Sequence, residues 1–393
     1  MIDPERLLTD EGERAIALAC DQADPGSLAA ATALRRHVDA DLAAAALDQA
    51  ALRRRARAKF GPAVDRMLLT AHGTEQATRP AVAAWRARRM AASGVRTIVD
   101  LGCGLGADAL AFHAAGLDVV AVERDHRTAV FARHNLAGRA RVIEGDAVAE
   151  LPGLVAGRDP ASVAVFCDPA RRTERGRTWR VDQFSPPWDF VVSVLGEFPV
   201  ACVKLGPGLP LELVPDDVEV RWVSEAGDVV EAALWRLPDA APGRSVTLLP
   251  QDLSVGPEIA PVEPPVGDLS RYVVEPDGAL LRAGLTASVF PGWVQLAPGL
   301  GYLTADRPVD SPWGEMFEVL EVLDPGEKSL RQWVRANRVG TLEIKKRAVD
   351  VDPAALRRRL KLAGPRAATL VLTPTTRGAR ALVVRRVRPG SPS

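Results

Sequence analysis

The chain has 393 residues, of which 47% are hydrophobic and 25% charged, and its formal net charge is zero. This is the composition of an ordinary globular protein, but the length exceeds one hydrophobic core, so we expect two or three domains. The chain has no apolar run near the ~20 residues of a membrane span and no secretory signal in residues 1–9, so we expect a cytoplasmic protein with no membrane partner. Its four cysteines form no C-x-x-C pair, so we expect neither a zinc site nor a disulfide framework.

Residues 1–92 are expected to form an N-terminal helical region. Alanine is abundant there, and apolar residues such as Leu42, Ala45 and Ala46 recur three and four positions apart, as on one face of a helix. Near the end of the region, Thr78 stands where it would cap the next helix. The stretch around it is either a simple helix start or a segment that closes over a ligand.

A buried strand, a glycine turn and a helix follow one another in residues 95–115. The strand runs into Asp100, and the turn contains Gly102, Gly104 and Gly106. Such a unit opens a nucleotide pocket in an α/β sheet, because glycine lets the backbone approach a ligand closely. The turn also fits the dinucleotide pattern G-x-G-x-x-G/A. The Asp100 carboxylate, however, would repel a pyrophosphate at the helix N-terminus and suits the amino and sulfonium groups of S-adenosylmethionine, which favours a methyltransferase over a dehydrogenase.

Three further strands end in acidic residues. A strand over residues 118–123 ends at Glu123, about 20 residues past the first glycine, where an acid can accept both ribose hydroxyls. A strand over residues 140–144 is followed by Asp146, which can accept from an adenine amino group. A strand over residues 162–168 ends at Asp168, and Pro169 fixes the turn. Each acid alone reads as a solvated strand end, but together they indicate a ligand site at one edge of the sheet.

The remaining strands of this domain complete an α/β sheet. Residues 198–205 form a fifth strand that carries Lys204, and residues 218–224 and 228–237 are joined by a link short enough only for a hairpin. Five parallel strands followed by an antiparallel pair predict a Rossmann-like doubly wound sheet of seven strands with a reversed last strand. We place this domain at residues 93–240.

The motifs of residues 96–238 resemble those of the class I S-adenosylmethionine-dependent methyltransferases. The resemblance rests on D-L-G-C-G-L-G at residues 100–106, on Glu123, on Gly145-Asp146 and on Asp168-Pro169. It implies that Asp100 and the glycines hold the methionine part of the cofactor, Glu123 the ribose and Asp146 the adenine, with Asp168 at the methyl-accepting side. N-methyltransferases commonly continue this last motif with a second proline and an aromatic residue, whereas here Ala170 follows, so the methylated atom stays open.

The C-terminal part is basic. A proline-rich linker is expected at residues 241–268, followed by a small α+β domain at residues 269–393 with the order βαβαββ from residue 315. From Gly326 onward there are 17 Lys and Arg against 4 Asp and Glu. The D-P-A-R-R motif, F-S-P-P-W at residues 184–188, K-L-G-P-G at 204–208 and L-E-I-K-K-R at 342–347 resemble a bacterial family that pairs a methyltransferase with a THUMP-like domain. THUMP domains proper occur in RNA-modifying enzymes, so the resemblance implies RNA as the partner.

Arginine and lysine side chains are the candidate RNA contacts. Guanidinium groups pair with phosphates, and aromatic rings stack on unpaired bases. In the loop after Asp168 the candidates are Arg171 and Arg172, together with Arg175, Arg177, Arg180 and the nearby rings of Trp179, Phe184 and Trp188. Lys204 is a further candidate in the same domain. In the C-terminal domain the candidates are Lys345, Lys346, Arg347, Arg357, Arg358, Arg359 and Lys361. The alternative is that these cations pair with acids of the same protein.

The chemistry predicted for the site is methyl transfer to an RNA base, with Asp168 orienting the acceptor. Methylation of a protein or a small anionic molecule is an alternative, and so is a non-catalytic RNA-binding module that retains the cofactor fold. Cys167 is disfavoured as a nucleophile, because adjacent strand residues point to opposite faces and Asp168 is expected to face the cofactor. The sequence does not specify the RNA species or the oligomeric state.

Overall fold

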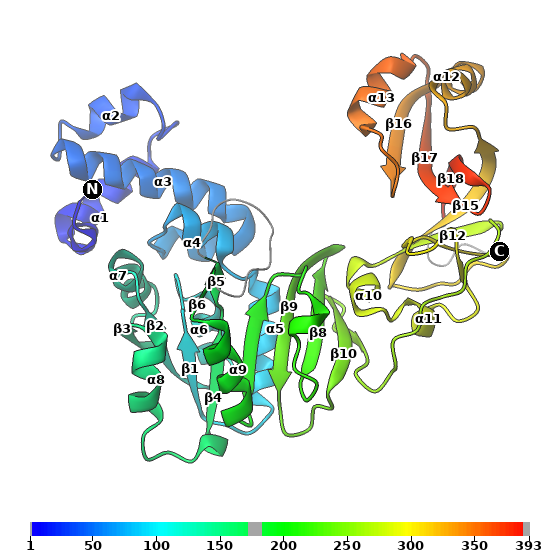
Figure 1. The fold of residues 1–393 in the computed structure, drawn as a ribbon. Helices are drawn as coiled ribbons and strands as arrows, with labels where there is room; N and C mark the ends of the chain where they lie inside the picture. The colour runs from blue at the N-terminus through cyan, green and yellow to red at the C-terminus, as the bar shows by residue number, and fades with distance from the viewer. Residues whose placement is uncertain (1, 172–182, 388–393) are drawn as a thin grey trace. The chain divides into compact units, whose positions relative to one another are not determined.

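The computed structural model describes residues 2–171 and 183–387, and the chain divides into two compact units (Figure 1). The first unit comprises residues 1–220 and 231–242, and the second comprises residues 221–230 and 243–393. The division passes through one β-hairpin, whose base belongs to the first unit and whose tip belongs to the second.

The N-terminal helices begin at side-chain caps. Thr9 accepts from the Gly12 N–H at 3.1 Å, and Asp39 accepts from the Leu42 N–H at 3.0 Å, so each satisfies a donor that the first turn leaves free. One apolar cluster joins these helices to Leu105 and Phe131 of the following domain. The helices are α1 (Asp10–Cys20), α2 (Leu28–Leu34), α3 (Ala40–Phe60), α4 (Ala71–Gln76) and α5 (Pro80–Ala91).

The sheet of the first unit has the strand order β9-β7-β4-β1-β2-β3. The five strands β1 to β4 and β7 are parallel, and β9 runs antiparallel to β7. Together with β8, which precedes β9 in the hairpin, these strands confirm the predicted Rossmann-like sheet with a reversed last strand. The predicted count of seven is too low, because two further strands of the second unit extend the sheet to nine strands. The strands are β1 (Thr97–Leu101), β2 (Asp118–Glu123), β3 (Ala140–Glu144), β4 (Val163–Cys167), β7 (Ala201–Leu205), β8 (Glu219–Glu225) and β9 (Asp228–Arg236).

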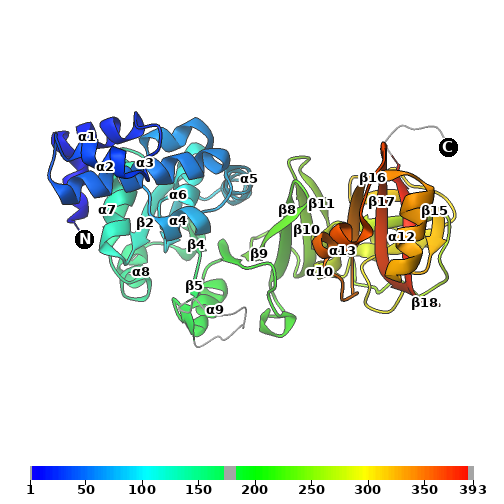
Figure 2. The same cartoon turned by 90° about the horizontal axis from the view of Figure 1, so that it is seen from above.

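Helices cover both faces of this sheet, as Figure 2 shows: α5 to α7 lie on one face and α8 and α9 on the other. The bounds are α6 (Ala107–Ala114), α7 (His126–Asn135), α8 (Ala147–Val155) and α9 (Trp188–Glu197). The loops that follow β1, β2, β3, β4 and β7 therefore gather at one edge, which we call the carboxyl edge. Two short strands, β5 (Ala170–Arg171) and β6 (Phe184–Ser185), pair beyond β4.

The second unit begins with strands that the sequence did not predict. The segment 241–268, expected as a linker, contains all of β10 (Gly243–Leu249) and β11 (Leu253–Val255), which pair antiparallel to each other. Within the sheet, β10 lies between β11 and β8. Its buried side chains include Val246 and Leu248. The proline-rich stretch from Pro257 to Pro265 forms no helix or strand.

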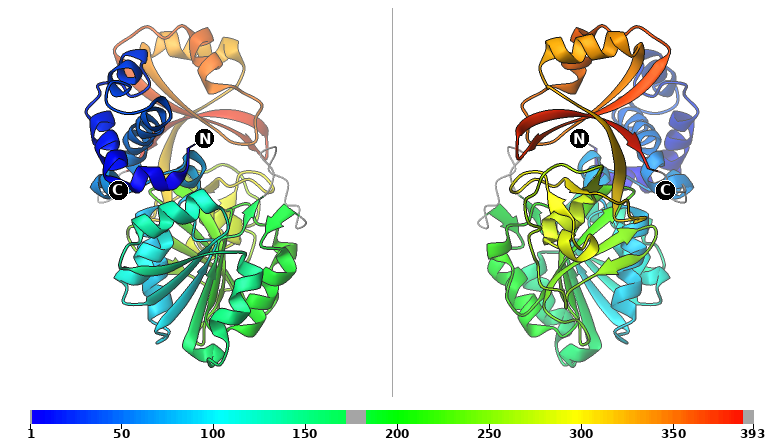
Figure 3. Two further views of the ribbon diagram at one scale, coloured as in Figure 1. Left: turned by 90° about the vertical axis from the view of Figure 1, so that its left-hand side faces the viewer. Right: turned by 90° about the vertical axis from the view of Figure 1, so that its right-hand side faces the viewer.

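The remainder of the second unit contains a seven-stranded sheet in the order β13-β14-β12-β15-β18-β17-β16. Figure 3 shows α12 and α13 together over one face of it, where Leu330 and Leu356 belong to their shared core. From β15 onward the elements follow the predicted βαβαββ order. The bounds are β12 (Tyr272–Pro276), α10 (Gly278–Ala283), α11 (Thr286–Val289), β13 (Val294–Gln295), β14 (Leu303–Ala305), β15 (Gly314–Leu323), α12 (Glu327–Ala336), β16 (Val339–Lys346), α13 (Pro353–Leu360), β17 (Arg366–Thr375) and β18 (Gly378–Arg386). Among the described helices, none has the length and apolar character needed to cross a bilayer.

Candidate active site

The glycine turn joins β1 to α6 at the carboxyl edge. Gly102, Gly104 and Gly106 have φ angles of 85°, 55° and 87°, a left-handed conformation that favours glycine. A Cβ on Gly106 would lie 2.8 Å from the Leu136 side chain, so packing also excludes a larger residue there. A Cβ on Gly104 would meet no described protein atom within 4 Å. The Leu136 side chain therefore packs against the turn at Gly106, whereas the space next to Gly104 is open and leaves room for a ligand.

Asp100 is a buried carboxylate beside this turn. Its exposed fraction is 0%, and among the described residues neither of its oxygens has a hydrogen-bond partner. Burial raises the pKa of Asp100 well above its ordinary value, and the charges of Asp108 and Asp168 raise it further, against Arg86 and Lys204. A buried carboxylate without a partner is costly. A cationic ligand would relieve that cost, so this arrangement fits a sulfonium or amino group.

Glu123 is tied to the glycine turn. One carboxylate oxygen accepts from the Gly104 N–H at 3.0 Å, and the other accepts from the Asp125 N–H at 2.8 Å. Asp146, in contrast, is exposed and caps α8 by accepting from the Val148 N–H at 2.9 Å. The structure therefore brings Glu123 against the turn, while Asp146 has a helix-capping contact of its own.

Asp168 and Lys204 form an ion pair at the ends of β4 and β7. The Asp168 N–H donates to the Leu101 carbonyl at 3.4 Å, and a Cβ on Gly102 would lie 3.5 Å from the Asp168 carbonyl oxygen. Burial, the largest single influence, works to lower the pKa of Lys204, but the charges of Asp168, Asp108 and Glu231 together outweigh it and the pKa is raised. The structure thus brings Asp168, buried Pro169 and Lys204 next to the glycine turn.

The comparisons with known proteins agree with this geometry. An uncharacterised S-adenosylmethionine-dependent methyltransferase from two strains of Mycobacterium tuberculosis is 34% identical to the chain over 337 residues, which cover 82% of this chain and 90% of the relative. The chain belongs to the S-adenosylmethionine-dependent methyltransferases. It is an enzyme whose cofactor is S-adenosylmethionine.

Three further matches concern the domains and the fold of the methyltransferase. A family described as THUMP domain-like matches residues 314–386, and one described as a domain of unknown function matches residues 3–56. A solved structure of a candidate methyltransferase from Porphyromonas gingivalis W83 is 22% identical, with a TM-score of 0.74 and coverage of 96% of this chain and 99% of that one. This last likeness is one of fold, and it extends over both units.

The two cysteines next to the site, Cys103 and Cys167, are poor nucleophiles. Cys167 is fully buried in β4, and burial raises the pKa of its thiol well above the ordinary value. The same holds for Cys103 in the glycine turn, which is 9% exposed. Because the thiolate is the reactive form, neither residue is suited to covalent chemistry.

The sequence missed a buried ionic network behind the glycine turn. Arg86 of α5 is 0% exposed and donates to Asp108 of α6 and to Glu231 of β9, the latter at 2.5 Å. Thr78, expected as a helix cap, donates instead to Asp108 at 2.5 Å, and α5 starts after Arg79. Asp108 has the sequence appearance of an ordinary acid in a first helical turn, and its partners lie 22 and 30 residues away along the chain. No sequence motif predicts these contacts of Asp108 with Arg86 and Thr78.

Several predicted RNA contacts of the methyltransferase have acidic partners instead. Lys345 lies 2.7 Å from Glu275 and 2.6 Å from Glu315, and Arg347 lies 3.9 Å from Glu275. Lys346 is exposed at the end of β16. Arg359 pairs with Glu327 at 2.9 Å, whereas Arg357, Arg358 and Lys361 are exposed on or next to α13. These residues belong to the second unit, whereas Asp100, Glu123, Asp168 and Lys204 belong to the first.

The arginine-rich loop after Asp168 lies largely beyond what can be described. Arg171 ends β5, opposite Phe184 of β6. Arg172, and with it Arg175, Arg177, Trp179 and Arg180, falls outside the described residues. Phe184 and Trp188 lie with ring centroids 5.6 Å apart.

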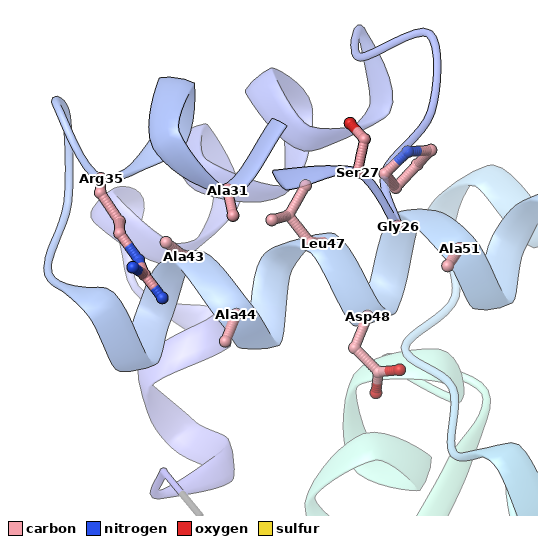
Figure 4. Close-up of a pocket in the computed structure, with 10 residues that line it drawn as sticks. Gly26, Ser27, Ala31, Arg35, Ala43, Ala44, Leu47, Asp48 and Ala51 are labelled. Atoms are coloured by element: carbon pink, nitrogen blue, oxygen red, sulfur yellow. The ribbon is translucent and has the colours of Figure 1, made fainter. Parts of the chain in front are cut away.

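A pocket of about 340 Å³ lies apart from these residues, between α2 and α3 (Figure 4). Small apolar side chains, among them Ala31, Ala43 and Leu47, make up most of its lining, and Arg35 and Asp48 stand toward opposite ends. None of the sequence motifs falls in it.

Proposed function

We propose that the enzyme methylates a base in RNA, with Asp168 orienting the acceptor. The single observation that carries the catalytic part is the Asp168–Lys204 pair, which lies beside Gly102 and near Asp100, a carboxyl group without a hydrogen-bond partner in the part of the chain that the structure describes. The RNA part is supported by the THUMP-like domain, since THUMP domains proper occur in RNA-modifying enzymes.

In this proposal Asp100 faces the amino and sulfonium groups of S-adenosylmethionine, and the backbone of Gly102, Gly104 and Gly106 approaches its methionine part. Glu123 accepts from the ribose hydroxyls. Its carboxylate is held next to the glycine turn by the hydrogen bond from the Gly104 N–H. Asp146 accepts from the adenine amino group with the oxygen that does not cap α8. The cofactor supplies an activated methyl group, so the protein has mainly to align the acceptor and remove one proton.

Asp168 performs the alignment. Lys204 holds the carboxylate in one place at the end of β4, and the carboxylate accepts an N–H or O–H of the base. Its loop continues through Pro169 to Arg171 and Arg172, which we assign to the phosphates of the same nucleotide strand. In the THUMP-like domain, exposed Lys346 is a better candidate for a phosphate contact than Lys345 or Arg347, which have acidic partners.

The experiment that tests this function is mass spectrometry of modified nucleosides in RNA from cells with and without the gene. The expected result is one methylated nucleoside that disappears with the gene, returns with the wild-type gene and does not return with Asp168→Asn. Unchanged nucleosides in every RNA fraction, from a protein that binds S-adenosylmethionine, would contradict the RNA substrate.

Two alternatives make different predictions. A methyltransferase of proteins or small anionic molecules would bind RNA, if at all, with little dependence on salt, whereas phosphate contacts make binding fall steeply as salt rises. A binding module without turnover would leave S-adenosylmethionine intact beside every RNA fraction.

A further inference from the structure

The middle residue of the glycine turn is buried among the N-terminal helices. Leu105 lies between Gly104 and Gly106, and its side chain is 2% exposed. It belongs to the same apolar cluster as Leu42 of α3 and Leu69, which lies between α3 and α4. The packing of the turn therefore depends on residues of the N-terminal region.

One side-chain amide bonds the turn to this region. Asn135, the last residue of α7, is buried, and its amide group makes three hydrogen bonds. Its nitrogen donates to the Leu105 carbonyl at 3.1 Å and to the Leu68 carbonyl at 3.0 Å, and its oxygen accepts from the Leu68 N–H at 2.8 Å. An ionised carboxylate could only accept, so the amide allows one side chain to join the turn to the N-terminal region.

A second amide holds the next residue of the same segment. Gln49 of α3 is 0% exposed, donates to the Leu69 carbonyl at 2.7 Å and accepts from the Leu69 N–H at 2.8 Å. Leu68 and Leu69 lie in no helix or strand, so the two amides supply the partners that buried backbone groups require. The segment between α3 and α4 is thus held by Gln49 of the N-terminal helices and by Asn135 of the sheet domain.

Helix α4 follows this segment and packs on the turn. Thr70 caps it by accepting from the Gly73 N–H at 3.0 Å. A Cβ on Gly73 would lie 2.8 Å from the Leu105 side chain and 2.7 Å from the Thr70 hydroxyl. Beyond the other end of α4, Thr78 donates to Asp108 of α6 at 2.5 Å. None of the residues of α4 is buried, and Figure 1 shows the helix at the carboxyl edge of the sheet, so contacts at its two ends hold it there.

A simpler role for these contacts is to attach the N-terminal helices to the sheet domain. Apolar packing of Phe131 of α7 in the same cluster already contributes to that attachment. Attachment, however, does not require the Asn135 amide and the close approach of Gly73 to meet at Leu105. This residue is flanked by two glycines whose backbones have few steric limits. Fixing Leu105 fixes the backbone next to the open space at Gly104.

We propose that Asn135 and Gly73 are positioning residues for S-adenosylmethionine. Through Leu105 they set the conformation of the glycine turn, so the N-terminal helices form part of the cofactor site. The inference rests on the proposed function in assigning the turn to the methionine part of the cofactor, and it is independent of the RNA substrate. Cofactor binding and the docking of residues 68–78 on the turn are then coupled, and each strengthens the other.

The first test measures the affinity of the full-length protein for S-adenosylhomocysteine by calorimetry. Gly73→Ala is expected to weaken binding about tenfold, or about 1.4 kcal/mol, a typical cost of overpacking, because the added Cβ pushes against buried Leu105. Gly153→Ala is the matched control, since Gly153 also lies within a helix and a Cβ there would meet no described atom within 4 Å. Equal affinities of the two variants would overturn the proposal.

A double-mutant cycle shows whether Gly73→Ala acts through the turn or through the Thr70 cap. In a Leu105→Ala background the added Cβ no longer meets the leucine side chain, so Gly73→Ala is expected to cause no further loss of affinity. The same loss in both backgrounds would place the effect at the cap and overturn the positioning role.

Asn135→Asp tests the hydrogen bonds. The carboxylate keeps the bond from the Leu68 N–H and loses both donations, so the affinity for S-adenosylhomocysteine is expected to fall about tenfold. Gln49→Glu is the matched control, because it makes the same change at a buried amide whose hydrogen bonds go to Leu69 and not to the turn. Equal losses in the two variants, or no loss in Asn135→Asp, would count against Asn135 as a positioning residue.

Hydrogen exchange of the wild-type protein does not depend on the folding of any variant. With S-adenosylhomocysteine bound, the Leu68 N–H is expected to exchange at least about fivefold more slowly, the lower end of usual couplings between two sites. The Ala30 N–H, which donates to Ser27 at the start of α2, should be unchanged. Peptide mass spectrometry compares the two, and unchanged exchange at Leu68 or equal slowing at both positions would overturn the coupling.

The inference and the proposed function fail in different ways. Weakened cofactor binding in Asp100→Asn with none in Gly73→Ala would remove the N-terminal helices from the site and keep the turn as the cofactor site. Unchanged binding in both variants would remove the assignment of the turn itself. Weakened binding in Gly73→Ala, without methylation of any RNA fraction by the wild type, would remove the RNA substrate and keep the inference.

Discussion

Two regions of this molecule treat their charged side chains in opposite ways. At the carboxyl edge of the methyltransferase sheet, Asp100 is buried and has no hydrogen-bond partner among the described residues. On the sheet of the THUMP-like domain, Lys345 lies between Glu275 and Glu315, and Arg386 bridges Glu315 and Glu343. Charges that neutralise one another support the fold, whereas a buried charge left alone reduces stability and marks the place where a ligand must supply the partner.

The largest effect is expected from a network that is both buried and paired. Arg86→Met leaves Asp108 and Glu231 without their cation, and breaking a buried ion pair in this way costs about 3–5 kcal/mol. Denaturant unfolding measures the loss, with exposed Arg139→Met as the control. A loss below about 1 kcal/mol, the value of a surface pair, would mean that the network contributes little.

Asp168→Asn is expected to lower kcat at least about 100-fold, the usual contribution of a positioned acid–base group. Affinity for S-adenosylmethionine should stay near that of the wild type, because the residue is assigned to the acceptor. Asp118→Asn, exposed at the opposite end of a strand, is the control. Single-turnover methylation of total RNA separates the two quantities, and a variant with normal kcat would remove Asp168 from the mechanism.

Asp100→Asn sharpens the contrast between the two regions most directly. Cofactor affinity is expected to fall between about 10- and 100-fold, as for a lost charge-assisted contact. The melting temperature of the cofactor-free protein should not fall, because the substitution replaces a buried carboxyl group that makes no hydrogen bond to any described residue. Calorimetry and thermal unfolding on the same sample test both statements. A destabilised variant that still binds the cofactor would show that Asp100 supports the fold.

The pKa of Asp100 gives a pH dependence with a definite sign. Burial raises this pKa in the free protein, and a bound cation favours the ionised carboxylate, so binding should release a proton and strengthen as pH rises through the raised pKa. The native state also binds this proton more tightly than the unfolded state, so the Asp100 contribution to stability declines as pH rises above the ordinary aspartate range. Calorimetry in buffers of different ionisation enthalpy detects the proton, and Asp100→Asn should release none.

The smallest effect is expected in the THUMP-like domain. Lys345→Met should change RNA affinity less than about twofold and leave its salt dependence unaltered, because this lysine is engaged with two carboxylates, whereas Lys346→Met should reduce the salt slope by about one. Filter binding at several salt concentrations compares the two. Equal salt slopes of RNA affinity for both variants would mean that Lys345 contacts RNA despite its ion pairs with Glu275 and Glu315.

The sequence predicted the parts of the site that follow from local rules. The alternation of strands and helices, the glycine turn and the acids that end strands are local patterns, so Asp100, Glu123 and Asp168 could be placed at one edge before any coordinates. The pairing of Asp168 with Lys204 depends on the neighbouring positions of β4 and β7, 36 residues apart in sequence, and strand order is not a local property.

What the sequence could not provide are contacts between distant elements. Arg86 looks like an ordinary charged residue on an alanine-rich helix, and only packing of that helix on the domain shows that its side chain is buried. Strands β10 and β11 were missed for a different reason. Proline and glycine flank both strands, and these residues are as typical of a linker as of the ends of an edge strand.

The position of Arg86 on α5 has a practical consequence for anyone who trims this protein. A fragment starting at residue 93, the domain boundary that the sequence predicts, would lack the Arg86 guanidinium group. It would leave two buried carboxylates, Asp108 and Glu231, without this cation. A shorter version that keeps these contacts therefore has to begin upstream of Thr78, and a catalytic core cut at residue 93 is expected to be destabilised.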